Sequence, residues 1–250
     1  MPIFPTTERT RAPSPYYPMT LARYFALIPA AGVGARMGGN IPKQYAQLAG
    51  KTMLHHVLAT FSSAPSIAHT FVVVSSDDAF IDGTLAGLPA GTHNITVLRV
   101  GGATRQLSVL NGLHAMRESV GDDDWMLVHD AARPGLSMEL IDKLILDLQD
   151  DEVGGLLALP VVDTLKRAGS QGRVELTVPR EQLWAAQTPQ MFRYGLLLHA
   201  LEKAVTVTDE AGAIEALGLQ PKLVAGHVRN FKVTLPHDVA LAELYLKGLV

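Results

Sequence analysis

The first chemistry-bearing stretch of the sequence is AAGVGARM, residues 30–37, which follows the apolar run FALIP. Gly32 and Gly34 let a backbone approach a ligand closely, and a loop of this kind supplies backbone N–H groups. Arg36 lies in the same loop, and Lys43 follows seven residues later in PKQY. Two cations beside exposed N–H groups form a cradle for a triphosphate, so the pattern predicts a phosphate-binding site.

Two common phosphate-binding loops do not fit this stretch. The glycines at 32, 34 and 38 have the spacing G-x-G-x-x-x-G, whereas a dinucleotide-binding fold has G-x-G-x-x-G. That fold also places an acidic residue about 20 positions onward, and residues 52–60 contain none. The P-loop pattern G-x-x-x-x-G-K-[ST] is missing from the sequence. A nicotinamide-dependent oxidoreductase therefore stays only as a weaker alternative.

The composition narrows the class of protein further. The formal net charge of -3 over 250 residues argues against a broad nucleic-acid-binding surface, although it allows a local basic pocket for a small anion. The sequence has no cysteine, which excludes disulfides, thiolate nucleophiles and Cys-ligated metals and fits a reducing, cytoplasmic compartment. No apolar run approaches the roughly 20 residues that span a bilayer. We therefore expect neither nucleic acid nor a membrane as a partner.

Short apolar runs alternate with helix-like stretches from Phe25 onward. We expect strands at 25–30, 71–76, 95–100, 125–134 and 154–168, and helices at 52–64, 106–118, 138–149 and 195–205. We further expect a loop at 185–192, a strand pair within 221–235 and a closing helix from Asp238. Such alternation predicts an α/β fold with a mostly parallel sheet and helices on both faces. Ligands bind beyond the carboxyl ends of such strands, where residues 30–37 and 130–133 lie.

Two segments depart from this alternation. Residues 1–24 are rich in proline and lack hydrophobic periodicity, so we expect a flexible N-terminal tail before a single domain at 25–250. Residues 164–183 are too polar for a core and carry the turn signal Gly169–Gly172, which predicts a β-hairpin. The composition leaves open whether this hairpin is solvated or packs on another subunit.

In addition to PAAGVGARM and PKQY, seven further motifs follow in order. They are Gly101-Gly102 with Arg105 and Ser108-Val109, VHDAARP at 128–134, DTLK at 163–166, Arg180 with Leu183-Trp184, TPQ at 188–190, TDEA at 208–211, and NFKVT at 230–234. Together they resemble the 2-C-methyl-D-erythritol 4-phosphate cytidylyltransferase family, from about Phe25 to the end of the sequence. The family commonly has an acidic residue where this chain has Ala103, so a side-chain contact to the base is missing and backbone contacts carry more weight.

The resemblance implies a fold, a reaction and an assembly. The fold is a Rossmann-like sheet of the nucleotide-diphospho-sugar transferase type, with a β-arm at about 161–184 that clasps a second subunit in a homodimer. The reaction transfers CMP from CTP to methylerythritol phosphate and releases pyrophosphate, in the non-mevalonate isoprenoid pathway. Mg²⁺ is the implied cofactor, bound mainly through the triphosphate, and we name no protein ligand for it. A cytidylyltransferase acting on ribitol 5-phosphate and a non-catalytic nucleotide-binding regulator remain as alternatives.

Site residues follow from the resemblance, position by position. The catalytic set is Arg36, Lys43, Arg180 and Lys232. The nucleotide-binding set is Pro29, Ala30, Ala31, Gly32, Gly34, Gly102, Ser108, Asp130 and Ala131. The substrate-binding set is Asp130, Arg133, Thr164, Arg180, Thr188, Thr208 and Lys232. For Asp130 the alternative is a cap of the 130–133 turn. Asp209 and Glu210 are either supporting groups of the site or acids at a helix start, and we favour the second interpretation.

Overall fold

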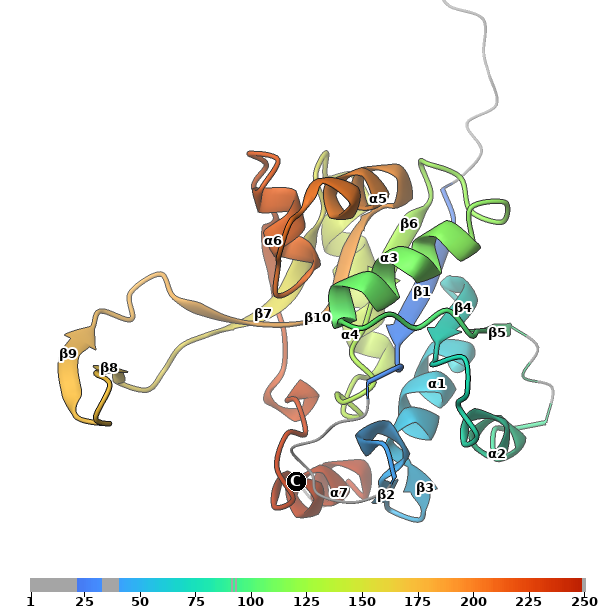
Figure 1. Cartoon of the computed structure of the whole chain (residues 1–250), viewed down its shortest axis with the longest axis horizontal. Helices are drawn as coiled ribbons and strands as arrows, with labels where there is room; N and C mark the ends of the chain where they lie inside the picture. Colours follow the sequence, from blue (N-terminus) through green and yellow to red (C-terminus); the bar gives the residue numbers. More distant parts are fainter. Residues whose placement is uncertain (1–21, 33–40, 91, 93, 249–250) are drawn as a thin grey trace, which may run out of the picture.

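A seven-stranded sheet forms the centre of the molecule, as the computed structural model in Figure 1 shows. The structure describes residues 22–32, 41–90, 92 and 94–248, so the predicted tail up to residue 21 and the predicted site residues Gly34 and Arg36 lie outside the described part. The order is β11 (Lys222–Ala225), β7 (Gly155–Pro160), β10 (Trp184–Arg193), β6 (Trp125–Val128), β1 (Tyr24–Pro29), β4 (Ile67–Val73) and β5 (Ile95–Leu98). The neighbouring strands pair in parallel except β10, which is antiparallel to both β6 and β7. The mostly parallel sheet is thus confirmed.

Helices cover both faces of the sheet because its strands bury both sets of side chains. In β1, Ala26 and Ile28 pack in one core with α1 (Met53–Ser63) and α4 (Met138–Leu148). Phe25 and Leu27 point to the other core, which includes α3 (Arg105–Ala115), α5 (Tyr194–Lys203) and α6 (Glu210–Glu215). The apolar, non-alternating strands of the sequence are therefore buried on both sides.

The smaller elements lie around this framework. They are the 3-10 helices η2 (Lys43–Tyr45) and η3 (Val228–Asn230), the strands β2 (Gln47–Leu48) and β3 (Lys51–Thr52), and the helices α2 (Ile81–Ala86) and α7 (Asp238–Leu246). A third, small core joins α7 to the start of α1 through Leu48, Met53, Val233 and Ala242. Among the described residues, none of the helices has both the length and the apolar character needed to cross a bilayer.

Two sequence-based expectations about elements are wrong. Residues 185–192 form most of β10 and not a loop, because polar side chains of this strand are buried and hydrogen-bonded; Gln190, for example, bonds Asp209 and the N–H of Ala211. Within 221–235 only β11 is a strand, and η3 follows it. Next along the chain, Val233 donates its N–H to the carbonyl of Ala132, which draws this segment toward the ends of the central strands.

The predicted hairpin projects from the body of the molecule (Figure 1). It consists of β8 (Leu165–Ala168) and β9 (Val174–Val178), paired antiparallel. Gly172 has a φ of 69°, a left-handed conformation that glycine adopts without strain, and its N–H bonds the carbonyl of Gly169. The hairpin and its turn are therefore confirmed, and almost all of its side chains are exposed in the single chain.

Candidate active site

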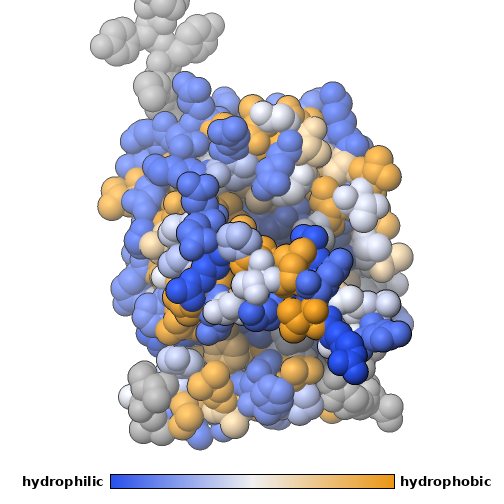
Figure 2. Space-filling model, turned by 90° about the vertical axis from the view of Figure 1, so that its left-hand side faces the viewer, coloured by the Kyte–Doolittle hydropathy of each residue, from blue (hydrophilic) through white to orange (hydrophobic). Residues whose placement is uncertain are grey.

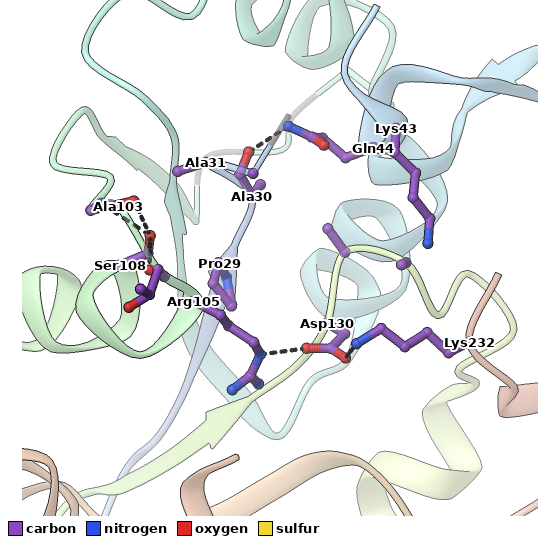
Figure 3. Close-up of a pocket in the computed structure, with 15 residues that line it drawn as sticks. Pro29, Ala30, Ala31, Lys43, Gln44, Ala103, Arg105, Ser108, Asp130 and Lys232 are labelled. Carbon is purple, nitrogen blue, oxygen red and sulfur yellow. Dashed lines mark hydrogen bonds and ion pairs between the residues drawn. The ribbon is translucent and has the colours of Figure 1, made fainter. Parts of the chain in front are cut away.

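A pocket of about 440 Å³ opens beyond the carboxyl ends of β1 and β6 (Figure 3). It is lined by Pro29, Ala30, Ala31, Gly32, Lys43, Gln44, Gly102, Ala103, Thr104, Arg105, Ser108, Asp130, Ala131, Ala132 and Lys232. All described residues of the predicted nucleotide-binding set are in this lining, together with Lys43 and Lys232 of the predicted catalytic set. Three cations and a single carboxylate line the pocket, so its described lining is positively charged and suits a polyphosphate.

Ala30, which follows β1, is held by hydrogen bonds to both of its backbone groups. Its N–H donates to the carbonyl of Val73 at 2.7 Å, and its carbonyl accepts from the side-chain amide of Gln44 at 2.6 Å. Gln44 is buried, and its neighbour Tyr45 donates its hydroxyl to Asp78 at 2.7 Å. Because Gln44 adjoins Lys43, this bond sets the position of the predicted catalytic lysine relative to the glycine loop.

Gly101 and Gly102 form a turn at which side chains would not fit, and Gly102 lines the pocket. A Cβ on Gly101 would lie 2.3 Å from the Cβ of Ala31, and one on Gly102 would lie 2.5 Å from the Cβ of Leu107. Contacts this short do not occur between real Cβ atoms. Gly101 thus lets the backbone of the turn approach Ala31 closely, and Gly102 lets it approach the first turn of α3.

Ser108, a predicted nucleotide contact, uses its hydroxyl to shape this turn. Its Oγ accepts the N–H of Gly102 at 3.0 Å and lies 2.9 Å from the carbonyl of Thr104, to which it donates. The side chain is almost fully buried, at 3% exposure. Ser108 therefore holds the Gly102 backbone in place beside the pocket, which is compatible with base recognition by backbone groups.

Asp130 lies at the centre of a charged network (Figure 3). Its Oδ1 accepts from Arg105 at 2.8 Å, and its Oδ2 accepts from Lys232 at 2.7 Å. Burial alone would raise the pKa of Asp130, but the positive charges of Arg105 and Lys232 outweigh burial and lower the pKa far below its usual range. The 130–133 turn is closed by the N–H of Arg133 bonding the Asp130 carbonyl, so the side chain is engaged with cations and not with the turn.

Arg105 also reaches a second carboxylate, and no site role for this arginine was predicted from the sequence. Its two terminal nitrogens bond Glu210 at 2.7 and 2.9 Å, in a bidentate pair. Burial alone would lower the pKa of Arg105, but Glu210 and Asp130 raise it above its ordinary value. Asp209 is the N-cap of α6, as interpreted, whereas Glu210, at 1% exposure, mainly serves this ion pair. The arginine in the Gly101-Gly102 motif was the available signal, but its partners lie 25 and 105 positions away.

A second cavity of about 160 Å³ adjoins the first. It is lined by Arg105, Asp130, Arg133, Ala186, Gln187, Thr188, Gln190, Thr208, Asp209 and Lys232. Arg105, Asp130 and Lys232 line both cavities. Arg133 is held by two carbonyls, those of Asn230 and Ala186, at 2.8 and 3.1 Å. The fold therefore brings together Arg133, Thr188, Thr208 and Lys232 of the predicted substrate set.

Comparison with known proteins decides the family. The model of the family described as 2-C-methyl-D-erythritol 4-phosphate cytidylyltransferase matches residues 24–248. The chain belongs to this family. A cytidylyltransferase of that description from Nitrosospira multiformis is 56% identical, over 91% of this chain and 99% of the relative. One from Nitrosomonas eutropha is 54% identical over 91% and 98%. The crystal structure of the Francisella tularensis enzyme superposes with a TM-score of 0.76 at 34% identity, over 90% of this chain and all of that one.

Two predicted residues of this family member lie away from both cavities. Thr164 and Arg180 are exposed on the arm, and Arg180 donates to the carbonyl of Val162, which joins the segment before β8 to the segment after β9. The single chain therefore does not bring them to the charged network. Their predicted roles require a second subunit, and so does the predicted function of the arm.

No described group of three or more histidine, aspartate or glutamate residues could by itself hold a metal ion. Asp130 is the carboxylate of the larger pocket, and both of its oxygens already accept from cations. A protein-only magnesium site therefore does not fit the described residues of this family member. A Mg²⁺ ion coordinated mainly by substrate phosphates needs no such cage.

Proposed function

We propose that this chain transfers the cytidylyl group of CTP to the phosphate of 2-C-methyl-D-erythritol 4-phosphate, releasing pyrophosphate. The supporting observation is that the two adjoining cavities share Arg105, Asp130 and Lys232, in a chain that belongs to the matching family throughout residues 24–248. CTP occupies the larger cavity and the acceptor occupies the smaller one. The shared residues then lie where the two substrates meet.

In the larger cavity, the nucleotide lies against residues with small side chains or none. Residues 29–32 and 102–104 line it, and Lys43 in η2 adds a cation to this lining. Ala103 is exposed and offers no polar side chain, so backbone groups of the turn read the base. Arg36, in the same loop as Gly32 and Gly34, adds a second cation for the triphosphate in this proposal.

The chemistry is an in-line displacement at phosphorus. A phosphate oxygen of the acceptor attacks the α-phosphorus of CTP, and the bond from that phosphorus to the bridging oxygen of the β-phosphate breaks. The bonding pair leaves with pyrophosphate. Because the nucleophile is already an anion at neutral pH, the protein needs no strong general base, and its tasks are positioning and stabilising negative charge. Lys43 and Lys232 do this in the described site.

Lys232 connects the two substrates. Its ammonium group bonds Asp130 at 2.7 Å and lines both cavities. An ammonium on a flexible stem can bond a phosphate oxygen while it stays close to a carboxylate. Asp130, held ionised by Arg105, keeps the Lys232 ammonium at the junction before the acceptor phosphate arrives. Mg²⁺ neutralises triphosphate charge when it enters with CTP.

The arm supports the proposal of a homodimer. Val162 and Val174 are 74% and 64% exposed, and Trp184 at the base of the arm is 39% exposed. Figure 2, which views the side from which the arm projects, shows apolar side chains gathered among hydrophilic ones. Packing against a second copy would cover this surface and bring Thr164 and Arg180 to the neighbour's acceptor cavity. A cytoplasmic location is supported by the lack of cysteine.

Pyrophosphate release from CTP tests the function. We expect release that depends on methylerythritol phosphate and on Mg²⁺, and little release with ribitol 5-phosphate as the acceptor. Faster turnover with ribitol 5-phosphate would favour that alternative, and CTP binding without turnover of either acceptor would favour a nucleotide-binding regulator. In Lys43→Ala, we expect kcat to fall by about 100-fold or more, whereas Lys51→Ala, an exposed lysine on β3, serves as the matched control.

A further inference from the structure

Thr188 in the smaller cavity is part of a buried chain of hydrogen bonds. Its Oγ1 accepts the backbone N–H of Asp130 at 3.0 Å and lies 3.0 Å from Nδ1 of His129. On the other side of the imidazole ring, Nε2 of His129 lies 3.1 Å from the carbonyl oxygen of Arg133. His129 is fully buried, and Thr188 is 4% exposed. The proposed mechanism does not otherwise use His129.

The partners of the two ring nitrogens differ in what they can do. The carbonyl of Arg133 can only accept from Nε2, whereas the Thr188 hydroxyl beside Nδ1 can either donate or accept, so the proton of the neutral ring is assigned to Nε2. Burial lowers the pKa of His129 to about 4, so the ring is neutral at neutral pH. A neutral imidazole has one N–H, and Nδ1 is therefore an acceptor. Thr188 must donate its hydroxyl proton to Nδ1.

In this arrangement the Thr188 hydroxyl can only accept a further hydrogen bond. A threonine hydroxyl has one proton and two acceptor positions. His129 takes the proton, and the N–H of Asp130 takes one acceptor position. The remaining capacity of Thr188, which lines the cavity, is a single acceptor position.

We propose that His129 is a positioning residue which makes Thr188 an obligate hydrogen-bond acceptor, so that this threonine selects a donor hydroxyl on the acceptor substrate. The inference rests on the proposed function for the identity of that substrate. A donor hydroxyl on a polyol phosphate completes the chain of hydrogen bonds, whereas a carbonyl or ether oxygen at the same place leaves the acceptor position of Thr188 unpaired.

Neighbouring residues hold the His129 ring and Thr188 in this orientation. The ring of His129 packs edge-on against Phe61, with the ring centroids 5.5 Å apart. The carbonyl of Thr188 accepts from the buried Asn230 side chain at 2.8 Å. Strand β10 runs antiparallel to β6, with Gln190 opposite Val128, so Thr188 lies just beyond the end of β6, where His129 and Asp130 follow. Neither Thr188 nor His129 can turn without breaking these contacts.

The tautomer of His129 is measured directly by long-range ¹H–¹⁵N NMR of the unliganded protein at neutral pH, with His129→Asn identifying the resonance. We expect Nδ1 to resonate as an unprotonated nitrogen and Nε2 as a protonated one. A protonated Nδ1 would overturn the proposal. This measurement needs no turnover, so it tests the chain of hydrogen bonds even if the proposed function fails.

Kinetics of two isosteric variants test the consequence. In His129→Asn the amide oxygen can take the place of Nδ1 as acceptor, whereas in His129→Gln the amide reaches the place of Nε2 and leaves Thr188 without its acceptor. We expect His129→Gln to raise KM for methylerythritol phosphate about tenfold, to change KM for CTP less than about twofold, and His129→Asn to restore most of the loss. Equal effects of both variants on both substrates would refute the assignment. Wild-type enzyme inactive with methylerythritol phosphate would instead refute the proposed function.

Discussion

Replacing Glu210 by glutamine tests how Arg105 is held, and through it Asp130. The carboxylate accepts two hydrogen bonds from the guanidinium group, at 2.7 and 2.9 Å, and is 1% exposed. The amide that replaces this carboxylate would keep one acceptor oxygen but place an NH₂ donor against an N–H donor of Arg105. One charge-assisted bond is lost, and a buried donor is left without a partner.

The magnitude follows from these two losses. A hydrogen bond to a charged group contributes about 1.5–3 kcal/mol, and breaking a buried ion pair costs about 3–5 kcal/mol. Because Arg105 is 27% exposed and retains Asp130, we expect Glu210→Gln to lower the free energy of unfolding by about 3 kcal/mol. For a chain of this size, that corresponds to a decrease in Tm of about 6–12 °C.

Urea unfolding of wild type, Glu210→Gln and Glu215→Gln measures the effect. Glu215 is exposed on the same helix, so its substitution should change the free energy of unfolding by no more than about 0.5 kcal/mol. We also expect Glu210→Gln to lower kcat/KM about tenfold, because Arg105 loses the contact that fixes it against Asp130. A stability loss equal to that of the Glu215 control would refute this account of the pair.

Three further perturbations follow from the same contacts. Lys232→Ala should lower kcat/KM for the acceptor by about 10²–10³-fold, with little change in CTP affinity by calorimetry, because its ammonium bonds the acceptor phosphate; an equal loss of CTP affinity would contradict that role. Because the pKa of His129 falls from 6.5 to about 4 on folding, only the unfolded chain gains this proton between those pH values. Stability should therefore fall by about 3 kcal/mol as pH drops from 6.5 to 4, a loss that His129→Asn removes and that the exposed His237→Asn leaves in place. Gly101→Ala should weaken CTP binding at least tenfold, because its Cβ has no room, whereas Gly83→Ala in α2, with open space around it, should leave binding unchanged.

Much of the fold could be predicted because its signals are local. The apolar runs of β1, β4 and β6 are buried on both faces, and the turn at Gly169–Gly172 closes the hairpin as its residue types indicate. The strand β10 was not predicted, since Gln187, Thr188 and Gln190 look like loop residues. Their side chains are buried because distant partners satisfy their polar groups: Gln187 bonds the carbonyl of His227, Gln190 bonds Asp209, and the Thr188 hydroxyl bonds His129 and Asp130. No local pattern reveals such partners.

The candidate site likewise has features that the sequence predicts and features that depend on tertiary contacts. From the sequence, the resemblance to the family implied the small residues that line the pocket and the lysines at 43 and 232, because the motifs that carry this resemblance are local. Only the tertiary structure decided that Arg105 joins Asp130 to Glu210, and that Nδ1 of His129 lies 3.0 Å from Oγ1 of Thr188. These contacts join residues 25 to 105 positions apart, at the start of two helices and across two antiparallel strands. Distances and proton directions of this kind exist only once the chain has folded.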